Sequence, residues 1–126
     1  MKYEVPLVPQ TSRMSCWAAS IAMILGWQRQ MSMPDEIIAR NPGGTSYMTS
    51  YQTGLDPNDT YILNANGFDT EPPQCYTPEL IYSMLVSHGP LWVATWAPGP
   101  HIRVVTGMKS DELAINEPAR GNPVTT

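Results

Sequence analysis

Residues 10–20 read Q-T-S-R-M-S-C-W-A-A-S and contain Cys16, one of the two cysteines of the chain. Cys16 stands where an irregular polar segment gives way to an apolar run. The apolar residues recur at helical spacing and are Ala18, Ala19, Ile21, Ala22, Ile24 and Leu25. The hydroxyl side chains just before Cys16 are typical of a helix start. The pattern therefore predicts a buried helix over residues 15–28 with a cysteine in its first turn.

A cysteine in this position allows two interpretations. The unpaired backbone N–H groups and the positive dipole end of a helix start favour the thiolate, which is the nucleophilic form of the side chain. A free cysteine can equally be a small apolar residue of the core. The position of Cys16 alone leaves both interpretations open.

The residues around Cys16 resemble the active-site segment of the papain-like cysteine proteases, in which a glutamine and five further residues precede Cys-Trp-Ala-x-Ser. This chain fills the pattern with Gln10, Cys16, Trp17, Ala18 and Ser20. The usual Cys-Gly-Ser lead-in is replaced here by Arg-Met-Ser. The resemblance implies that Cys16 is the nucleophile, and that the Gln10 side-chain amide and the Cys16 backbone N–H form the oxyanion hole.

The two halves of the chain differ in character. Helices are expected over residues 15–28, 34–40, 56–65 and 77–87, a loop over 43–55, and strands over 68–70, 91–96, 101–107 and 112–116. Helices followed by antiparallel strands predict an α+β fold, with a helical part packed on a C-terminal antiparallel sheet. With 126 residues, the chain is expected to form a single catalytic domain over residues 1–126.

A cysteine nucleophile needs a base within hydrogen-bond reach. His101 opens an expected strand directly after a Pro-Gly-Pro turn, which places it near a rim of the sheet. His88 falls in the last turn of an expected helix, where a histidine commonly interacts with the helix dipole. His101 is therefore the predicted base, and His88 is expected to be structural.

The base in turn needs an orienting group. The order of histidine, strand, turn, strand and polar residue again resembles the papain-like fold. It is most similar to bacteriocin-leader peptidase domains and papain-like effectors, which place Asp-Pro after the last strand. Residues 116–118 read N-E-P here. Glu117 shares a strand face with apolar Ile115, so we favour Glu117 over Asn116 as the residue that orients His101, unless a bulge reverses the faces.

Composition and motif spacing argue against several other classes of protein. A net charge of −4 argues against binding to nucleic acid. No apolar run is long enough to span a membrane, and the first residues lack a signal-peptide core. The cysteines and histidines show no ligand spacing, so neither a metal nor another cofactor is expected. A disulfide between Cys16 and Cys75 is the less favoured alternative to two free thiols.

The resemblance implies a cysteine endopeptidase that hydrolyses peptide bonds in a protein or peptide substrate. Its compact bacterial character implies a toxin or effector, secreted without a signal peptide and acting in the cytoplasm of a target cell. A cognate immunity protein would be its natural partner. Two alternatives remain. The same fold could serve a deamidase, a transglutaminase or a peptidoglycan amidase, or it could be a catalytically inactive papain-like binding module.

Overall fold

The computed structural model describes residues 1–56, 59–70, 76–95, 101–110, 112–119 and 122–125. Its helices are α1 (Cys16–Arg29), α2 (Asp35–Arg40), α3 (Met48–Thr53), α4 (Tyr61–Ala65) and α5 (Pro78–His88). Its strands are β1 (Leu91–Thr95), β2 (His101–Lys109), β3 (Glu112–Glu117) and β4 (Asn122–Thr125). The strands form one antiparallel sheet in the order β1-β2-β3-β4. The helices precede the strands along the chain, as the α+β prediction required.

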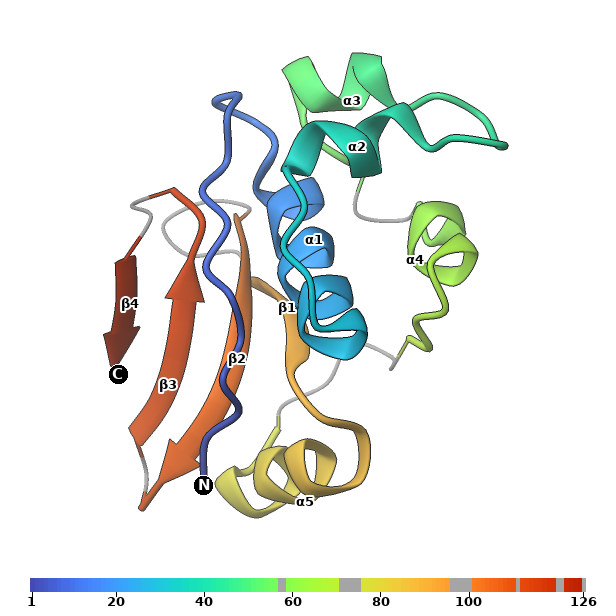
Figure 1. Ribbon diagram of the computed structural model, residues 1–126. Helices are drawn as coiled ribbons and strands as arrows, with labels where there is room; N and C mark the ends of the chain where they lie inside the picture. The colour runs from blue at the N-terminus through green and yellow to red at the C-terminus, as the bar shows by residue number, and fades with distance from the viewer. Residues whose placement is uncertain (57–58, 71–75, 96–100, 111, 120–121, 126) are drawn as a thin grey trace.

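Helix α1 is the centre of the main core and lies between the sheet and the helices α2, α3 and α4 (Figure 1). Every residue from 17 to 26 is buried, so the helix is enclosed on all sides rather than along one stripe. Small side chains such as Ala18 and Ala19, both without exposed surface, allow neighbouring elements to approach closely. The start of α1 is thereby held in a fixed place against the sheet.

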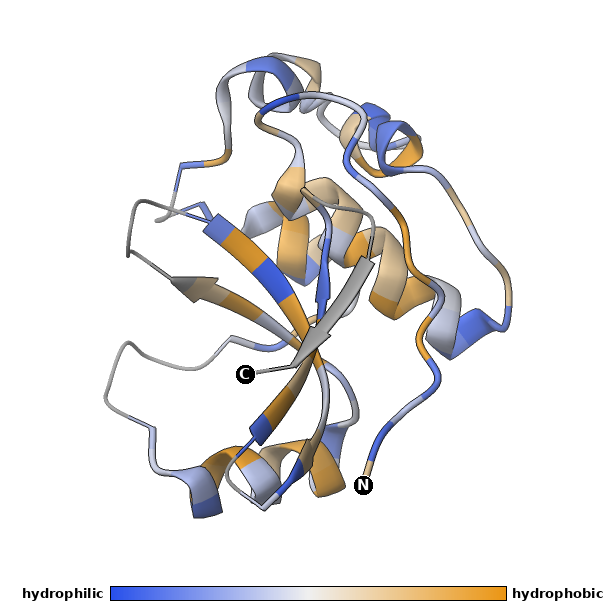
Figure 2. Cartoon of the chain, turned by 90° about the vertical axis from the view of Figure 1, so that its left-hand side faces the viewer, coloured by the Kyte–Doolittle hydropathy of each residue, from blue (hydrophilic) through white to orange (hydrophobic). Residues whose placement is uncertain are grey.

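The sheet buries apolar side chains on both faces. Val104 of β2 packs into the cluster around α1, whereas its neighbour Val105 packs with Leu85 of α5 and Ile115 of β3. Alternate residues of a strand point to opposite faces, so α1 covers one face and α5 the other. Figure 2 shows apolar residues recurring in the strands and in α1. A register shift between Val105 and Gly107 interrupts the pairing of β2 with β3.

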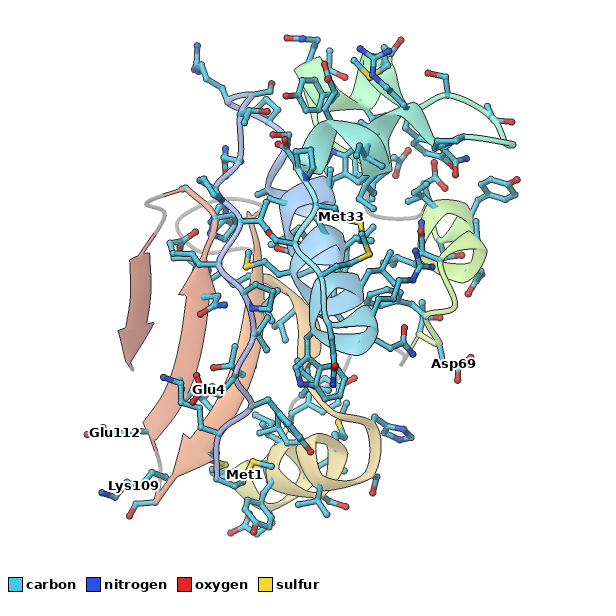
Figure 3. The ribbon with its side chains drawn as sticks, viewed as in Figure 1. Met1, Glu4, Met33, Asp69, Lys109 and Glu112 are labelled. Atoms are coloured by element: carbon cyan, nitrogen blue, oxygen red, sulfur yellow. The ribbon has the colours of Figure 1, made fainter. Side chains whose placement is uncertain are left out.

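The N-terminal segment runs along the sheet before the chain turns into α1 (Figure 1). The Tyr3 backbone N–H donates to the Thr106 carbonyl at 2.8 Å, and Lys2 forms a single bridge with Gly107. Figure 3 shows Met1 near α5 and the neighbouring ends of the sheet. A Cβ on Gly107 would lie only 2.3 Å from the Met1 carbonyl oxygen, so this close approach requires glycine.

Several expected boundaries were wrong. The expected loop over residues 43–55 contains α3, whose only buried residue is Tyr51, so the sequence carries no apolar period there. Residues 68–70 form no strand, because the Phe68 N–H donates to the Leu63 carbonyl and closes the end of α4. Helix α4 begins at Tyr61 rather than at 56, and strand β4 was not predicted.

Candidate active site

Three elements bring the predicted site residues to one end of the sheet (Figure 1). Helix α1 begins there with Cys16, strand β2 begins with His101, and strand β3 ends with Glu117. The antiparallel pairing of β2 and β3 explains part of this arrangement, because it places the start of one strand beside the end of the other. The residues 96–100 before His101, including the expected Pro-Gly-Pro turn, lie outside the described residues.

Glu117 joins His101 to a third side chain, Arg103. One carboxylate oxygen, Oε2, lies 2.5 Å from His101 Nε2, and the other, Oε1, accepts from Arg103 Nε at 2.8 Å. The Ala119 backbone N–H also donates to Oε2, at 3.2 Å. Glu117 is only 7% exposed, so these bonds fix a carboxylate that has little access to water. The imidazole is thereby held by Nε2, which leaves Nδ1 as the nitrogen suited to proton exchange with a thiol.

The surroundings of Glu117 also set its charge. Burial alone would raise the pKa of its carboxyl group. The hydrogen bonds from His101 and Arg103, with a smaller contribution from a backbone N–H, outweigh burial and hold that pKa below its ordinary value of 4.5. Glu117 is therefore an anion at neutral pH.

Asn116, the alternative orienting residue, points elsewhere. Its Nδ2 donates to the Val5 carbonyl at 3.1 Å, and the residue is 4% exposed. Adjacent strand residues face opposite sides, so Asn116 holds the N-terminal segment while Glu117 holds His101. Ile115 packs in the α5 cluster, which confirms the predicted strand face. A catalytic role for either residue stays a prediction.

Cys16 is half-buried at the first position of α1 and is a free thiol. Burial raises the pKa of this thiol above its ordinary value of 9.0, and the negative charge of Glu117 raises it further. Backbone N–H groups of Ile102, Trp17 and Cys16 itself lower the pKa but do not outweigh burial. The N–H groups of the helix start do favour the thiolate, as expected, but the expectation left out desolvation, which outweighs them. The contact with Ile102 places the sulfur beside the residue that follows His101.

Gln10 lies next to this end of the sheet, since its backbone N–H donates to the Pro118 carbonyl at 3.0 Å. Its side-chain Nε2 donates to the carbonyls of Ser12 and Arg13, at 2.9 and 2.8 Å. Both amide hydrogens are therefore directed at the turn before Cys16. Contact with a substrate oxyanion would require the amide to rotate or to share a hydrogen. The oxyanion role of Gln10 stays a prediction.

The sequence did not reveal two charged residues of this region. Arg103 is the partner of Glu117 described above, and Asp35 is a fully buried carboxylate bonded to the segment before Cys16. Arg103 shares a β-strand face with His101, and this spacing of two was the one available signal. No spacing links Asp35 to the residues before Cys16, because Asp35 meets Thr11 and Ser15 only through the folding of α2 against α1.

A hollow of about 490 Å³ borders the segment before Cys16. It is lined by Thr11, Ser12, Arg13, Met14, Tyr51 and Gln52.

Within the described residues, no group of three or more His, Cys, Asp or Glu side chains is placed to hold a metal ion. In the same part of the chain, no helix has the length and apolar character needed to cross a bilayer. His88 is exposed in the last turn of α5, and Cys75 lies outside the described residues.

A family model described as papain-like cysteine protease AvrRpt2 matches residues 1–125. The chain belongs to this family. It is therefore a papain-like cysteine protease by family, and the predicted fold and enzyme class are confirmed. Comparisons with curated proteins and with solved structures gave no match.

Proposed function

We propose that this papain-like protease is an endopeptidase in which Cys16 attacks the peptide carbonyl, His101 is the general base and Glu117 orients His101. The observation that carries the proposal is the bond between His101 Nε2 and Glu117, at the point where β2 begins beside Cys16. This bond fixes the ring by one nitrogen and directs proton transfer to the other.

The reaction begins from a neutral thiol, because the pKa of Cys16 is raised. His101 takes the thiol proton as the sulfur–carbon bond forms, and the carbonyl oxygen becomes an oxyanion. The Cys16 backbone N–H, at the start of α1, and the Gln10 amide are the proposed donors to that oxygen. His101 then gives the proton to the leaving amine as the carbon–nitrogen bond breaks. Water, deprotonated by the same ring, then attacks the acyl carbon; the carbon–sulfur bond breaks, the carboxylic acid leaves, and the ring returns the proton to the Cys16 sulfur.

The biological setting is proposed from the resemblance to compact bacterial enzymes. In this proposal the protein is an effector or toxin that cleaves a protein in the cytoplasm of a target cell. A cognate immunity protein with a basic contact face would suit the acidic chain, whose net charge is −4. Nucleic acid and membranes are not proposed as partners.

The test compares the wild-type protein with Cys16→Ala and His101→Ala in extracts of candidate target cells. New peptide N-termini, identified by amine labelling and mass spectrometry, should form with the wild type and be absent with both variants. The double variant should be no worse than either single variant, because the pair acts as a unit. Cleavage that persists in Cys16→Ala would refute the proposal.

The same experiment separates the alternatives. Conversion of glutamine to glutamate without a new N-terminus would indicate a deamidase that uses the same three residues, and a new crosslink would indicate a transglutaminase. Release of amine groups from purified peptidoglycan would indicate the amidase. Loss of every such change, together with retained binding to a target protein, would indicate an inactive binding module.

A further inference from the structure

Asp35 is a buried carboxylate that faces the segment leading into the nucleophile. It is the first residue of α2 and has no exposed surface. Its Oδ2 accepts from the Thr11 backbone N–H at 2.8 Å and from Ser15 Oγ at 2.7 Å, and its Oδ1 accepts from Thr11 Oγ1 at 2.6 Å. One carboxylate thus holds both ends of residues 11–15. Among the described residues, no cation pairs with it within ion-pair distance.

Further hydrogen bonds connect the two partners of Asp35 to the middle of residues 11–15 and to α3. Ser15 Oγ accepts from the Ser12 backbone N–H at 3.1 Å, and Thr11 Oγ1 shares a hydrogen bond with the hydroxyl of Tyr51 on α3. The carbonyls of Ser12 and Arg13 receive the Gln10 amide on the other side of the turn. The position of the Gln10 amide therefore depends on the turn that Asp35 fixes.

The same carboxylate affects the start of α1. Ser15 is the N-cap residue of α1, where a serine hydroxyl usually accepts from an N–H of the first turn. The Ser15 hydroxyl makes no such bond, because it is directed at Asp35 and Ser12. The N–H groups that an N-cap hydroxyl would reach, at the second and third positions of α1, are therefore not capped by Ser15. Ser15 instead ties the residue directly before Cys16 to Asp35.

We propose that Asp35 is a positioning residue that fixes the proposed oxyanion donor at the start of α1, the Cys16 backbone N–H, by holding Thr11 and Ser15 at the two ends of the turn before it. This inference rests on the proposed function of Cys16 as an acylated nucleophile. Burying a charge that is met only by neutral donors costs free energy. A stabilising role therefore explains the Asp35 carboxylate less well than a role in fixing the position of its partners does. Removing the charge should loosen the turn while leaving the thiol itself reactive.

Two reagents distinguish positioning of the oxyanion donors from a general effect on Cys16. p-Nitrophenyl acetate acylates the sulfur through a tetrahedral oxyanion: a sulfur–carbon bond forms, and the carbon–oxygen bond breaks to release p-nitrophenolate. Iodoacetamide alkylates the same sulfur by displacing iodide, without an oxyanion. The ratio of the two rates at Cys16 therefore reports how well the oxyanion donors are placed. Site occupancy is read by mass spectrometry of the intact chain.

The test compares Asp35→Asn with Glu36→Gln, a matched loss of one negative charge at the next position. Glu36 is a suitable control because it forms a surface pair with Arg40 at 3.3 Å. In Asp35→Asn we expect acylation to fall by about tenfold to a hundredfold, short of the loss of a whole donor, with alkylation close to the wild-type rate. In Glu36→Gln both rates should match the wild type.

Thr11→Val provides a second variant if Asp35→Asn does not fold, because it removes one donor to Asp35 without changing the charge. Combining Asp35→Asn with Gln10→Ala should cost less than the product of the two separate effects, since both residues bond to the same turn. Parallel loss of acylation and alkylation in both Asp35→Asn and Thr11→Val, or no loss of either, would overturn the inference. Failure of wild-type Cys16 to be acylated at all would instead refute the proposed function.

Discussion

Replacing Glu117 by glutamine should leave the shape of the site intact and reverse one of its hydrogen bonds. The glutamine oxygen can accept from Arg103, which is always a donor. Its Nε2 must then face His101 Nε2, so the histidine accepts where it previously met a carboxylate. That exchange favours a proton on His101 Nδ1, the nitrogen that should take the thiol proton. Glu117→Gln should therefore lower kcat by about 10²–10⁴, with KM little changed.

The stability change follows from the same contacts. Glu117 is 7% exposed and accepts two charge-assisted bonds; glutamine keeps the bond from Arg103 and replaces the other by a reversed bond between neutral groups. Exchanging one charge-assisted bond for a neutral one should lower the free energy of unfolding by about 1–1.5 kcal/mol. In a chain of 126 residues this corresponds to a fall in Tm of about 4–6 °C. Thermal unfolding at neutral pH measures the change.

The pH dependence of this contribution has a definite sign. The folded pKa of Glu117 lies below its ordinary value of 4.5, so the stabilisation is fully present above that pH. It is lost as the pH falls below 4.5 and through the folded pKa. The difference in Tm between wild type and Glu117→Gln should therefore shrink in acid.

Two further variants serve as controls for Glu117→Gln. Glu112→Gln removes the same charge from the exposed start of β3 (Figure 3), so it should alter neither kcat nor Tm appreciably. Asn116→Ala should destabilise the N-terminal segment through the lost bond to Val5 and act only mildly on kcat. Equal kcat in Glu117→Gln and wild type, or a larger kcat loss in Asn116→Ala, would refute the reasoning.

Three further predictions concern neighbouring features. Arg103→Gln removes a donor from Glu117, so the pKa of that carboxyl should rise. The acid limb of the kcat–pH profile should then move to higher pH. Lys109→Gln, on the same strand, is the control, and an acid limb that does not move in Arg103→Gln would contradict the prediction. Gly107→Ala would place a Cβ 2.3 Å from a backbone oxygen of the N-terminal segment and should cost about 1–3 kcal/mol in a denaturant titration, whereas unchanged stability would show that the segment can move aside. The alkylation rate of Cys16 by iodoacetamide should keep rising through pH 9, because burial raises the thiol pKa; a rate that is already at its plateau in acid would show a preformed ion pair.

The sequence predicted the elements that bury apolar side chains. The apolar run after Cys16 sets α1 to within a residue or two, and the β-rich second half sets β1, β2 and β3. Helix α3 was missed because it buries one side chain, Tyr51, and depends on tertiary contacts for its place. Strand β4 pairs through its backbone with β3 and follows a proline-rich tail that gives little periodic signal.

The site was predictable where a local rule set the geometry. The alternation of side chains along β3 predicted that Glu117 shares a face with Ile115. The irregularity in the pairing of β2 with β3 lies between Val105 and Gly107, away from the end of β3, so it does not disturb that alternation. Local rules failed for the thiol pKa, since desolvation of Cys16 comes from elements distant in sequence. Local rules also missed Asp35, because its partners Thr11 and Ser15 are distant from it in the sequence.

The charges of the site explain why proton transfer and attack should be coupled. At rest, the anion beside the imidazole is Glu117, and Arg103 bonds to it. A thiolate formed alone would add a second buried anion near Glu117, which is one reason the pKa of Cys16 is raised. Transfer of the thiol proton to His101 adds a cation beside Glu117 together with the new anion, so the net charge is unchanged. These charges disfavour a free thiolate, and they therefore support the proposal that the thiol proton passes to His101 as the sulfur attacks.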